Sequence, residues 1–183
     1  MIKLFEQYNE YNQVKEWLDE MKIRNYIIND DLTVDVNDDV DIRGCVLSEI
    51  PIQFGRVMGS FYCQNNFLKT LKGSPTYVDG AFNCSNNNLT TLEGCPKYIR
   101  RVFNFRENEI TSLKGAPNEV QGHFDYYENP LPIDILDFDD VVRYGDIKEL
   151  IKHQDEYGIW NNDGSLNQAR FDIFCKDYAS LVK

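Results

Sequence analysis

The chain has 183 residues, of which 42% are hydrophobic and 27% charged, so its length fits one domain and its composition excludes a disordered chain. The formal net charge of −11 disfavours direct nucleic-acid binding, which rests on basic side chains that neutralise phosphates. The N-terminus MIKLFEQYNE lacks the unbroken apolar core of a signal peptide, and no run approaches the roughly 18 apolar residues of a membrane span. We therefore expect a cytoplasmic protein that does not contact a membrane.

The negative charge lies at the two ends of the chain. Residues 1–49 hold 12 acids and 5 bases, a net charge of −7, and residues 134–183 hold 11 acids and 6 bases, a net charge of −5. Residues 50–133 hold 7 acids and 8 bases, a net charge of +1. The middle of the chain is thus almost neutral.

The first 29 residues predict a helical N-terminal cap. Apolar side chains recur mostly three, four or seven apart over residues 3–22, with Trp17 beside them, as in an amphipathic helix; they are Leu4, Tyr8, Tyr11, Leu18 and Met21. Two short strands should follow, over residues 26–28 and 32–36, with a turn at residues 29–31.

A period of 21 residues runs through the middle of the chain. It links four columns: Phe61, Phe82, Phe103 and Phe124; Asn66, Asn87, Asn108 and Asn129; Leu68, Leu89, Ile110 and Leu131; and Leu71, Leu92 and Leu113. A fixed period over several columns predicts a solenoid. Counting back 21 residues finds a divergent first unit at Val40, Ile42, Cys45, Leu47 and Ile50. We therefore expect about five coils over residues 30–133.

Each repeated residue type has a structural reason. Alternating apolar residues such as Phe82 and Cys84 fit a short strand with one face inward, and stacked coils should align these strands into a parallel β-sheet on the concave face. The phenylalanines should form an aromatic spine. The asparagines should bond backbone groups that the turn leaves unpaired, as a structural ladder; its members are Asn66, Asn87, Asn108 and Asn129.

The other side of each unit should be extended chain and tight turns. Glycine, which permits unusual backbone angles, precedes proline by two residues in three successive units. A further apolar column, Val57, Val78, Ile99 and Val120, follows these turns. A helix is not expected there.

These units resemble the leucine-rich repeat LxLxxNxLxxL, with aromatic and thiol substitutions at apolar sites. The stretches FNCSNNNLTTLEGCPKYIRR from Phe82 and FYCQNNFLKTLKGSPTYVDG from Phe61 are similar to repeats of small bacteriophage-encoded proteins. The resemblance covers about residues 30–133. It implies an α/β leucine-rich-repeat solenoid with helical caps, and it carries over no catalytic residues.

Residues 134–183 predict a helical C-terminal cap. One helix is expected at 147–157, with Asp146 as N-cap. After a turn at residues 161–164, Ser165 should cap a last helix that covers the final coil. Its apolar stripe would be Leu166, Ala169, Ile173, Phe174, Tyr178 and Leu181.

Candidate catalytic and metal-binding residues are few. The five cysteines form no CxxC pair, and we interpret them as buried free thiols. The turn ending at Gly164 fails as a calcium loop, because the twelfth position would be Arg170. Cys84 should point inward and His123 outward, so the two should not meet. We expect no enzyme activity, cofactor or metal.

The concave face is the surviving candidate for a binding site. Side chains between the inward positions of each strand point to solvent, and they include Tyr and Arg, which recur as interface anchors. The candidate binding residues are Asp41, Arg43, Tyr62, Gln64, Asn83, Ser85, Asn104, Arg106, His123, Asp125 and Tyr127.

Three functions remain open. The first is a protein-binding module that contacts, and could inhibit, a host protein if the phage resemblance holds. The second is an acidic decoy that imitates nucleic acid through the caps, motivated by acid clusters at Asp30 and Asp31, Asp38 and Asp39, and Asp137, Asp139 and Asp140. The third is a component of the virion.

Overall fold

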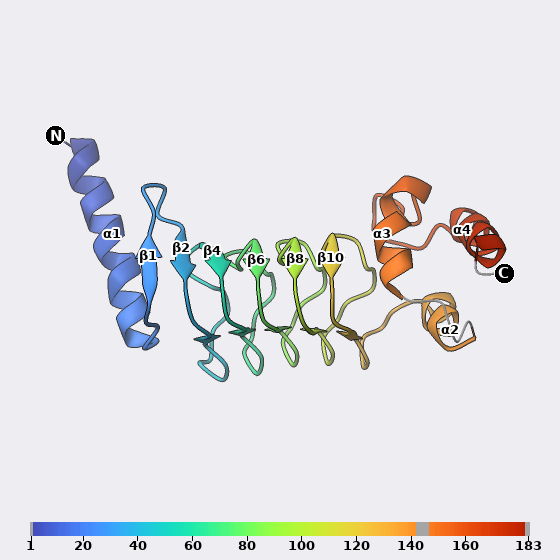
Figure 1. The fold of residues 1–183 in the computed structure, drawn as a ribbon, viewed down its shortest axis with the longest axis horizontal. Coiled ribbons are helices and arrows are strands. Elements are labelled where there is room, and N and C mark those ends of the chain that lie inside the picture. The colour runs from blue at the N-terminus through green and yellow to red at the C-terminus, as the bar shows by residue number, and fades with distance from the viewer. Residues whose placement is uncertain (1, 142–146, 182–183) are drawn as a thin grey trace.

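The computed structural model describes residues 2–141 and 147–181, with the backbone alone for residues 2–8, 139–141 and 181. It is an α/β structure in which a solenoid of about four turns carries helices at both ends (Figure 1). The predicted side-chain roles of Leu4, Tyr8 and Leu181, the N-cap at Asp146, and the side chains of Asp139 and Asp140 lie outside the described residues.

The solenoid holds two sheets on two of its sides. The six-stranded sheet, called sheet A, has the order β1 (Tyr26–Ile28), β2 (Val34–Val36), β4 (Phe54–Val57), β6 (Tyr77–Val78), β8 (Tyr98–Ile99) and β10 (Glu119–Val120). The five-stranded sheet, called sheet B, has the order β11 (Phe124–Asp125), β9 (Phe103–Asn104), β7 (Phe82–Asn83), β5 (Phe61–Tyr62) and β3 (Val40–Asp41). The predicted strand pair is present as β1 and β2, which are antiparallel, whereas every other strand pair of the two sheets is parallel.

The 21-residue spacing predicted from the sequence is confirmed by the register. In sheet B, Phe61 pairs with Phe82 and Phe82 with Phe103. Sheet A adds a finding, because the column of Val57, Val78 and Ile99 forms paired strands rather than unpaired extended chain. Gly73, Gly94 and Gly115 turn the chain toward sheet A with φ of 91°, 87° and 82°, a backbone conformation that favours glycine.

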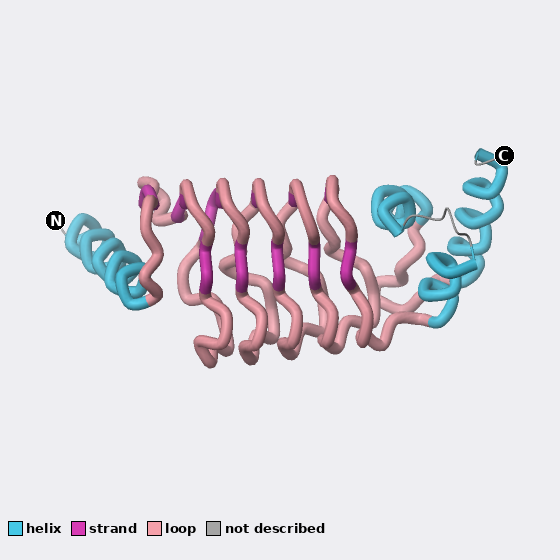
Figure 2. Tube along the Cα trace, turned by 60° about the horizontal axis from the view of Figure 1, so that its bottom comes forward, coloured by secondary structure: helices cyan, strands magenta, loops and turns pink. Residues whose placement is uncertain are grey.

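The row of sheet B strands is almost straight, not strongly concave (Figure 2). A solenoid curves when its two sides differ in coil spacing. Here both sides are hydrogen-bonded strand ladders, whose strands lie about 4.8 Å apart, so neither side is longer. We call the outward surface of this sheet the sheet B face.

The core is the space between the two sheets. Phe61, Phe82 and Phe103 are fully buried, and the centroids of consecutive rings from Phe61 to Phe124 are 5.5, 5.8 and 5.8 Å apart. Because aromatic pairs prefer offset or tilted arrangements, the rings rotate along the spine from an interplanar angle of 22° to one of 66°.

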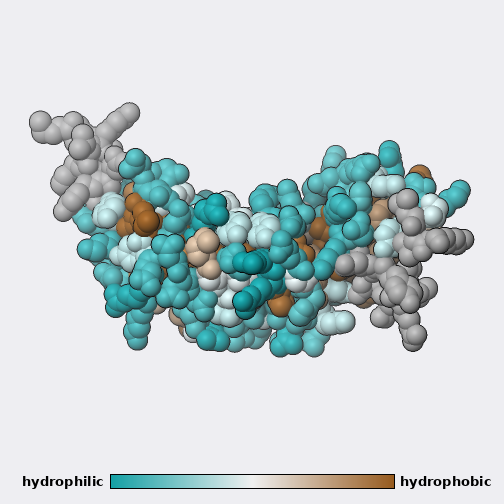
Figure 3. All heavy atoms as spheres, in the orientation of Figure 1, coloured by the Kyte–Doolittle hydropathy of each residue, from teal (hydrophilic) through white to brown (hydrophobic). Residues whose placement is uncertain are grey.

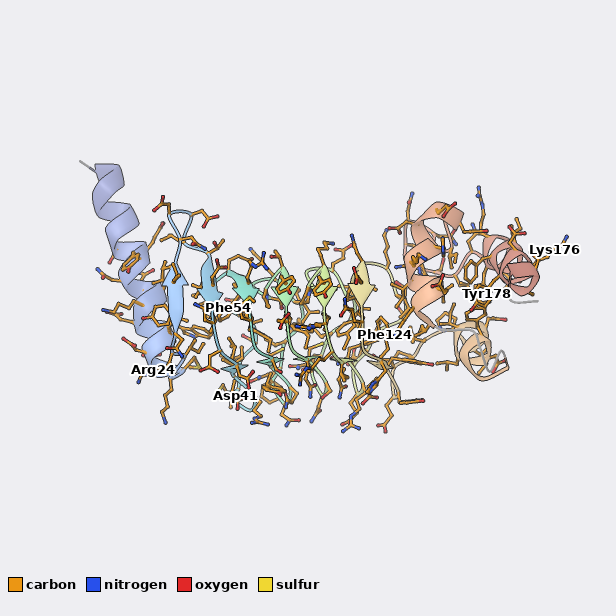
Figure 4. The ribbon with its side chains drawn as sticks, in the orientation of Figure 1. Arg24, Asp41, Phe54, Phe124, Lys176 and Tyr178 are labelled. Atoms are coloured by element: carbon orange, nitrogen blue, oxygen red, sulfur yellow. The ribbon has the colours of Figure 1, made fainter. Side chains whose placement is uncertain are left out.

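The N-terminal end is covered by α1 (Ile2–Glu20), whose predicted existence is confirmed. Leu18 is fully buried, and the Trp17 ring meets Phe54 edge-on with centroids 6.2 Å apart. Figure 4 shows Phe54 at this end of the solenoid and Phe124 at the other. The helix therefore closes the apolar core that an open solenoid would expose.

Three helices follow the last coil. They are α2 (Ile133–Val141), which the sequence analysis missed, α3 (Ile147–Tyr157), which matches the predicted range, and α4 (Gln168–Leu181). Ile147, Leu150 and Ile151 of α3 are buried, and α3 packs next to β10. The helix that covers the final coil is thus α3.

Two expectations for α4 were wrong. Ser165 does not cap it, because its hydroxyl and N–H donate to Asp163 at 2.6 and 3.0 Å, whereas Asn167 accepts from the N–H of Arg170 at 3.3 Å. The buried stripe is Phe171 and Phe174, with Tyr178 half-buried, while Ala169 and Ile173 are exposed. This stripe packs on Phe138 of α2 and Tyr157 of α3 rather than on the final coil.

Candidate functional site

The predicted binding residues lie on the sheet B face, and they differ in how far their side chains are exposed to solvent. Five are exposed, namely Asp41, Arg43, Arg106, His123 and Tyr127, and five are half-buried, namely Tyr62, Gln64, Asn83, Asn104 and Asp125. Ser85 is buried, with 6% exposure, and offers almost no surface. Figure 4 shows Asp41 at the N-terminal end of this face.

Several of these polar side chains also bind their own backbone. The side-chain oxygens of Asp41, Asn83 and Asn104 accept the N–H two residues later at 3.3, 3.0 and 3.2 Å. Asp and Asn commonly form such turns. The outward column therefore helps the chain leave each strand, a role that the sequence analysis did not assign.

Two clusters stand at the ends of the sheet B face. At the N-terminal end, the guanidinium of Arg43 donates to Asp41 at 2.7 Å and lies 5.4 Å from the centroid of the Tyr62 ring. At the other end, Arg106 pairs with Glu107 at 3.1 Å, and Tyr127, 65% exposed, stacks on Tyr126.

Between the two clusters the side chains are short. The coil of β7, which lies between the coil of Tyr62 and the coil of Arg106, presents Ala81, Asn83 and Ser85. The middle of the face therefore carries short side chains, and an arginine and a tyrosine project toward each end. Arginine and tyrosine are enriched among the residues that anchor protein interfaces.

Sheet A carries a second ordered surface, which the sequence analysis missed. The rings of Tyr77 and Tyr98 stack with centroids 4.9 Å apart and an interplanar angle of 2°, and the guanidinium of Arg56 lies 4.4 Å from the Tyr77 centroid. These three residues stand 21 apart in the sequence. The period thus contained the signal, but only pairing of these segments into one sheet places the side chains in contact.

Asp79 holds the Tyr77 side chain in place through a hydrogen bond and also pairs with Arg100. Its carboxylate accepts from the Tyr77 hydroxyl at 2.9 Å and pairs with Arg100 at 3.1 Å. The hydrogen bond from Tyr77, and after it Arg100, lowers the pKa of the Asp79 carboxyl, while the same bond raises the pKa of the Tyr77 hydroxyl. Both groups therefore stay in the protonation states that make the bond over the neutral pH range.

The asparagine ladder joins each coil to the coil before it. The Asn87 side-chain oxygen accepts from the N–H of Leu68, and its nitrogen donates to the carbonyls of Cys63 and Cys84. Asn66, Asn108 and Asn129 repeat this pattern. Because these bonds lie inside the coils, the four side chains present little surface to a ligand.

The expectation that all five cysteines are buried was wrong for Cys45, which is exposed, and for Cys175, which is only half-buried. Cys45 stands in the ladder column, but the first coil has no preceding coil to bind, so an inward amide is not needed there. Cys63, Cys84 and Cys95 are buried, and loss of hydration raises the pKa of each thiol, that of Cys95 to about 12. Cys84 is fully buried and His123 is exposed.

A surface groove of about 490 Å³ lies on the third side of the solenoid. It crosses the corner segments of two coils, with Leu71, Ser74, Lys72, Cys95 and Lys97 among its lining residues. None of the predicted binding residues lines it.

Within residues 2–141 and 147–181, His, Cys, Asp and Glu side chains form no group of three or more that could hold a metal ion. No helix of these ranges is both long and apolar enough to cross a membrane. Of the acid clusters, Asp31, Asp38 and Asp39 each accept a backbone N–H and so support turns and strand ends.

Compared with models of known families, with curated proteins and with solved structures, the chain shows no match.

Proposed function

We propose that the chain is a non-enzymatic protein-binding module of the cytoplasm, built as a leucine-rich repeat of five coils, that grips its partner on the sheet B face. The observation that carries the proposal is the pair of arginine and tyrosine clusters, Arg43 with Tyr62 and Arg106 with Tyr127, which stand on either side of short side chains. Truncating an arginine or tyrosine that serves as a hot spot of an interface typically costs about 2 kcal/mol or more.

The resemblance to small bacteriophage-encoded repeat proteins indicates the partner. We propose that it is a protein of a bacterial host, and that occupying it inhibits it. The net charge of only +1 on residues 50–133 supports recognition by shape and anchors, because a strongly charged face would attract any partner of opposite charge.

The test is capture from a bacterial lysate by the immobilised chain, with quantitative mass spectrometry. Tyr62→Ala, Arg106→Ala and Tyr127→Ala should each lower recovery of the same protein by about tenfold or more. Tyr11→Ala and Arg170→Ala are matched controls, because both side chains are exposed on helices outside this face. Equal recovery with all five variants would exclude the sheet B face.

A second candidate, an acidic decoy that acts through the caps, is favoured only by the uneven charge. The net charges of −7 and −5 at the ends would attract a nucleic-acid-binding protein. Such binding should weaken steeply between about 0.05 and 0.2 M salt. Capture that is unchanged over this range would reject the decoy and leave the sheet B proposal standing.

A further inference from the structure

The outward surface of sheet A consists of two parallel rows of side chains. The first row is Asp35, Arg56, Tyr77, Tyr98 and Glu119, and the second row is Met58, Asp79, Arg100 and Gln121. Within each row, neighbours are 21 residues apart and stand on neighbouring coils. Tyr77, Tyr98 and Asp79 are half-buried by their neighbours, whereas Arg56, Arg100 and Glu119 are exposed.

This surface is open and regular between the end helices. The strands β4, β6, β8 and β10 run side by side in Figure 1, and Figure 3 shows their face largely hydrophilic, with a small apolar area near β1 and β2. In Figure 2, α1 and α3 do not rise above the upper edge of the solenoid, which sheet A forms, whereas α4, beyond the last coil, extends past that edge. A partner could therefore lie along the rows between α1 and α4.

We propose that this partner is a second copy of the chain, docked sheet A to sheet A about a two-fold axis that runs parallel to the strands between β6 and β8. Such an axis reverses the order of the strands, so that β4 faces β10 and β6 faces β8 of the other copy. The interface is isologous, as in most homodimers, and every contact occurs twice.

Charge complementarity carries the choice of a second copy. In this arrangement Arg56 of one copy meets Glu119 of the other, and Asp79 of one copy meets Arg100 of the other. Tyr77 meets Tyr98 across the axis, so two stacked pairs of tyrosines come together at the centre. Met58 and Gln121 form a neutral pair. No like charges face each other in the two rows.

The position of the axis matters. If the axis passed through β8, Arg100 of one copy would face Arg100 of the other. If it passed through β6, Asp35 of one copy would face Glu119 of the other. Like charges in an interface are strongly unfavourable. Of these three axis positions, only the one between β6 and β8 pairs each charge of β4, β6, β8 and β10 in the two rows with an opposite charge.

The rows are also rigid before association. Tyr77 is held by its stacking on Tyr98, by the guanidinium of Arg56 and by its hydrogen bond to Asp79. Preformed anchors reduce the side-chain entropy that binding costs. Six strands at about 4.8 Å spacing span only about 24 Å, which is small for an interface, so we expect a micromolar or weaker dimer.

Sedimentation velocity of the full chain, from about 1 to about 500 µM, tests the proposal. The wild-type chain should shift from monomer to dimer with concentration. Arg56→Glu and Glu119→Arg each create two like-charge contacts per dimer and should weaken association by about tenfold or more. The double variant Arg56→Glu/Glu119→Arg should recover it, because both charges are then exchanged.

An equimolar mixture of the two single variants gives an independent measurement. One copy then holds Glu at positions 56 and 119 and the other holds Arg at both, so the mixed dimer satisfies both contacts and should form where neither variant alone does. Lys69→Glu and Glu109→Arg, exposed charges outside the two rows, should leave association unchanged. A chain that stays monomeric throughout, or single variants that do not complement each other, would overturn the proposal, whatever the outcome on the sheet B face.

Discussion

Two adjacent columns of the solenoid both contain asparagine, but the two positions make different demands on the side chain. The buried ladder at positions 66, 87, 108 and 129 is asparagine throughout, because its amides bond carbonyls and an N–H inside the coils. The outer column, one position earlier, holds Asn65, Asn86, Glu107 and Glu128, with φ of 59°, 51°, 55° and 59°.

The difference lies in what each position demands. The buried ladder demands a specific set of donors and an acceptor, and so only one residue type serves. The outer column demands only a left-handed backbone, which Asn tolerates better than other side chains. Its one side-chain bond between coils, from Asn86 to Asn65 at 2.9 Å, is exposed. Substitutions should therefore lower the free energy of unfolding strongly in the buried ladder and only slightly in the outer column.

Asn87→Leu should destabilise the chain more than any other single substitution considered in these two columns. Leucine keeps the size of the side chain but leaves the buried N–H of Leu68 and the carbonyls of Cys63 and Cys84 without the amide. Each buried polar group left unsatisfied costs about 1–3 kcal/mol, so we expect the free energy of unfolding to fall by about 3 kcal/mol or more. Urea denaturation measures it. Asn88→Ala, at an exposed neighbour, is the control, and equal losses for the two variants would contradict the role of the ladder.

Asn86→Ala should have an intermediate effect. Alanine at a φ of 51° costs about 1 kcal/mol more than asparagine, and the exposed bond to Asn65 adds a few tenths. The same denaturation experiment should show a loss of about 1 kcal/mol. Asn86→Gly should lose less than Asn86→Ala, because glycine accepts this conformation. The reverse order would show that the side chain, not the backbone, matters here.

Glu128→Asn should stabilise the chain slightly. Glu128 is exposed with a φ of 59°, and asparagine relieves part of the strain, a gain of about 0.5 kcal/mol. The melting temperature should rise by one or two degrees, as follows from about 2–4 °C per kcal/mol at this size. Glu128→Ala, which removes the charge but keeps Cβ and the strain, is the matched comparison and should not match that gain.

Cys45→Asn should have the smallest effect. It completes the ladder column in sequence, but the first coil has no earlier coil whose carbonyls the amide could bond. The unfolding free energy should therefore change by less than about 0.5 kcal/mol, as for an ordinary surface substitution. A gain close to the loss caused by Asn87→Leu would mean that the ladder acts within a coil rather than between coils.

The two surfaces differ in how far the sequence predicted them. Strand alternation placed Tyr62, Arg106 and Tyr127 outside the core, and the structure leaves all three at least partly accessible. It did not show that Asn83 and Asn104 serve their own turns, because that depends on the local backbone. The Arg56, Tyr77 and Tyr98 row was missed, since two paired residues per coil are too short a strand to recognise.

The ends of the chain were predicted least well. Helix α3 matched its expected bounds, but α2 was missed, and the stripe predicted for α4 was right for Phe174 and Tyr178 but wrong for Ala169 and Ile173. The sequence of a short helix such as α4 is compatible with more than one buried face. The aromatic contacts of Phe138 with Phe171 and Phe174 show which face is buried.

The 21-residue period can be read from the sequence, and it predicts the solenoid and the division into inward and outward columns, because side chains repeated at one interval stack in register. The pairing of the second apolar column into sheet A, and the bonds from the asparagines to the preceding coil, follow only from the tertiary structure. The same holds for the contacts between the arginine and tyrosine side chains of sheet A. These contacts join coils that are separate in sequence, and their geometry is set by hydrogen bonds between strands rather than by any local pattern.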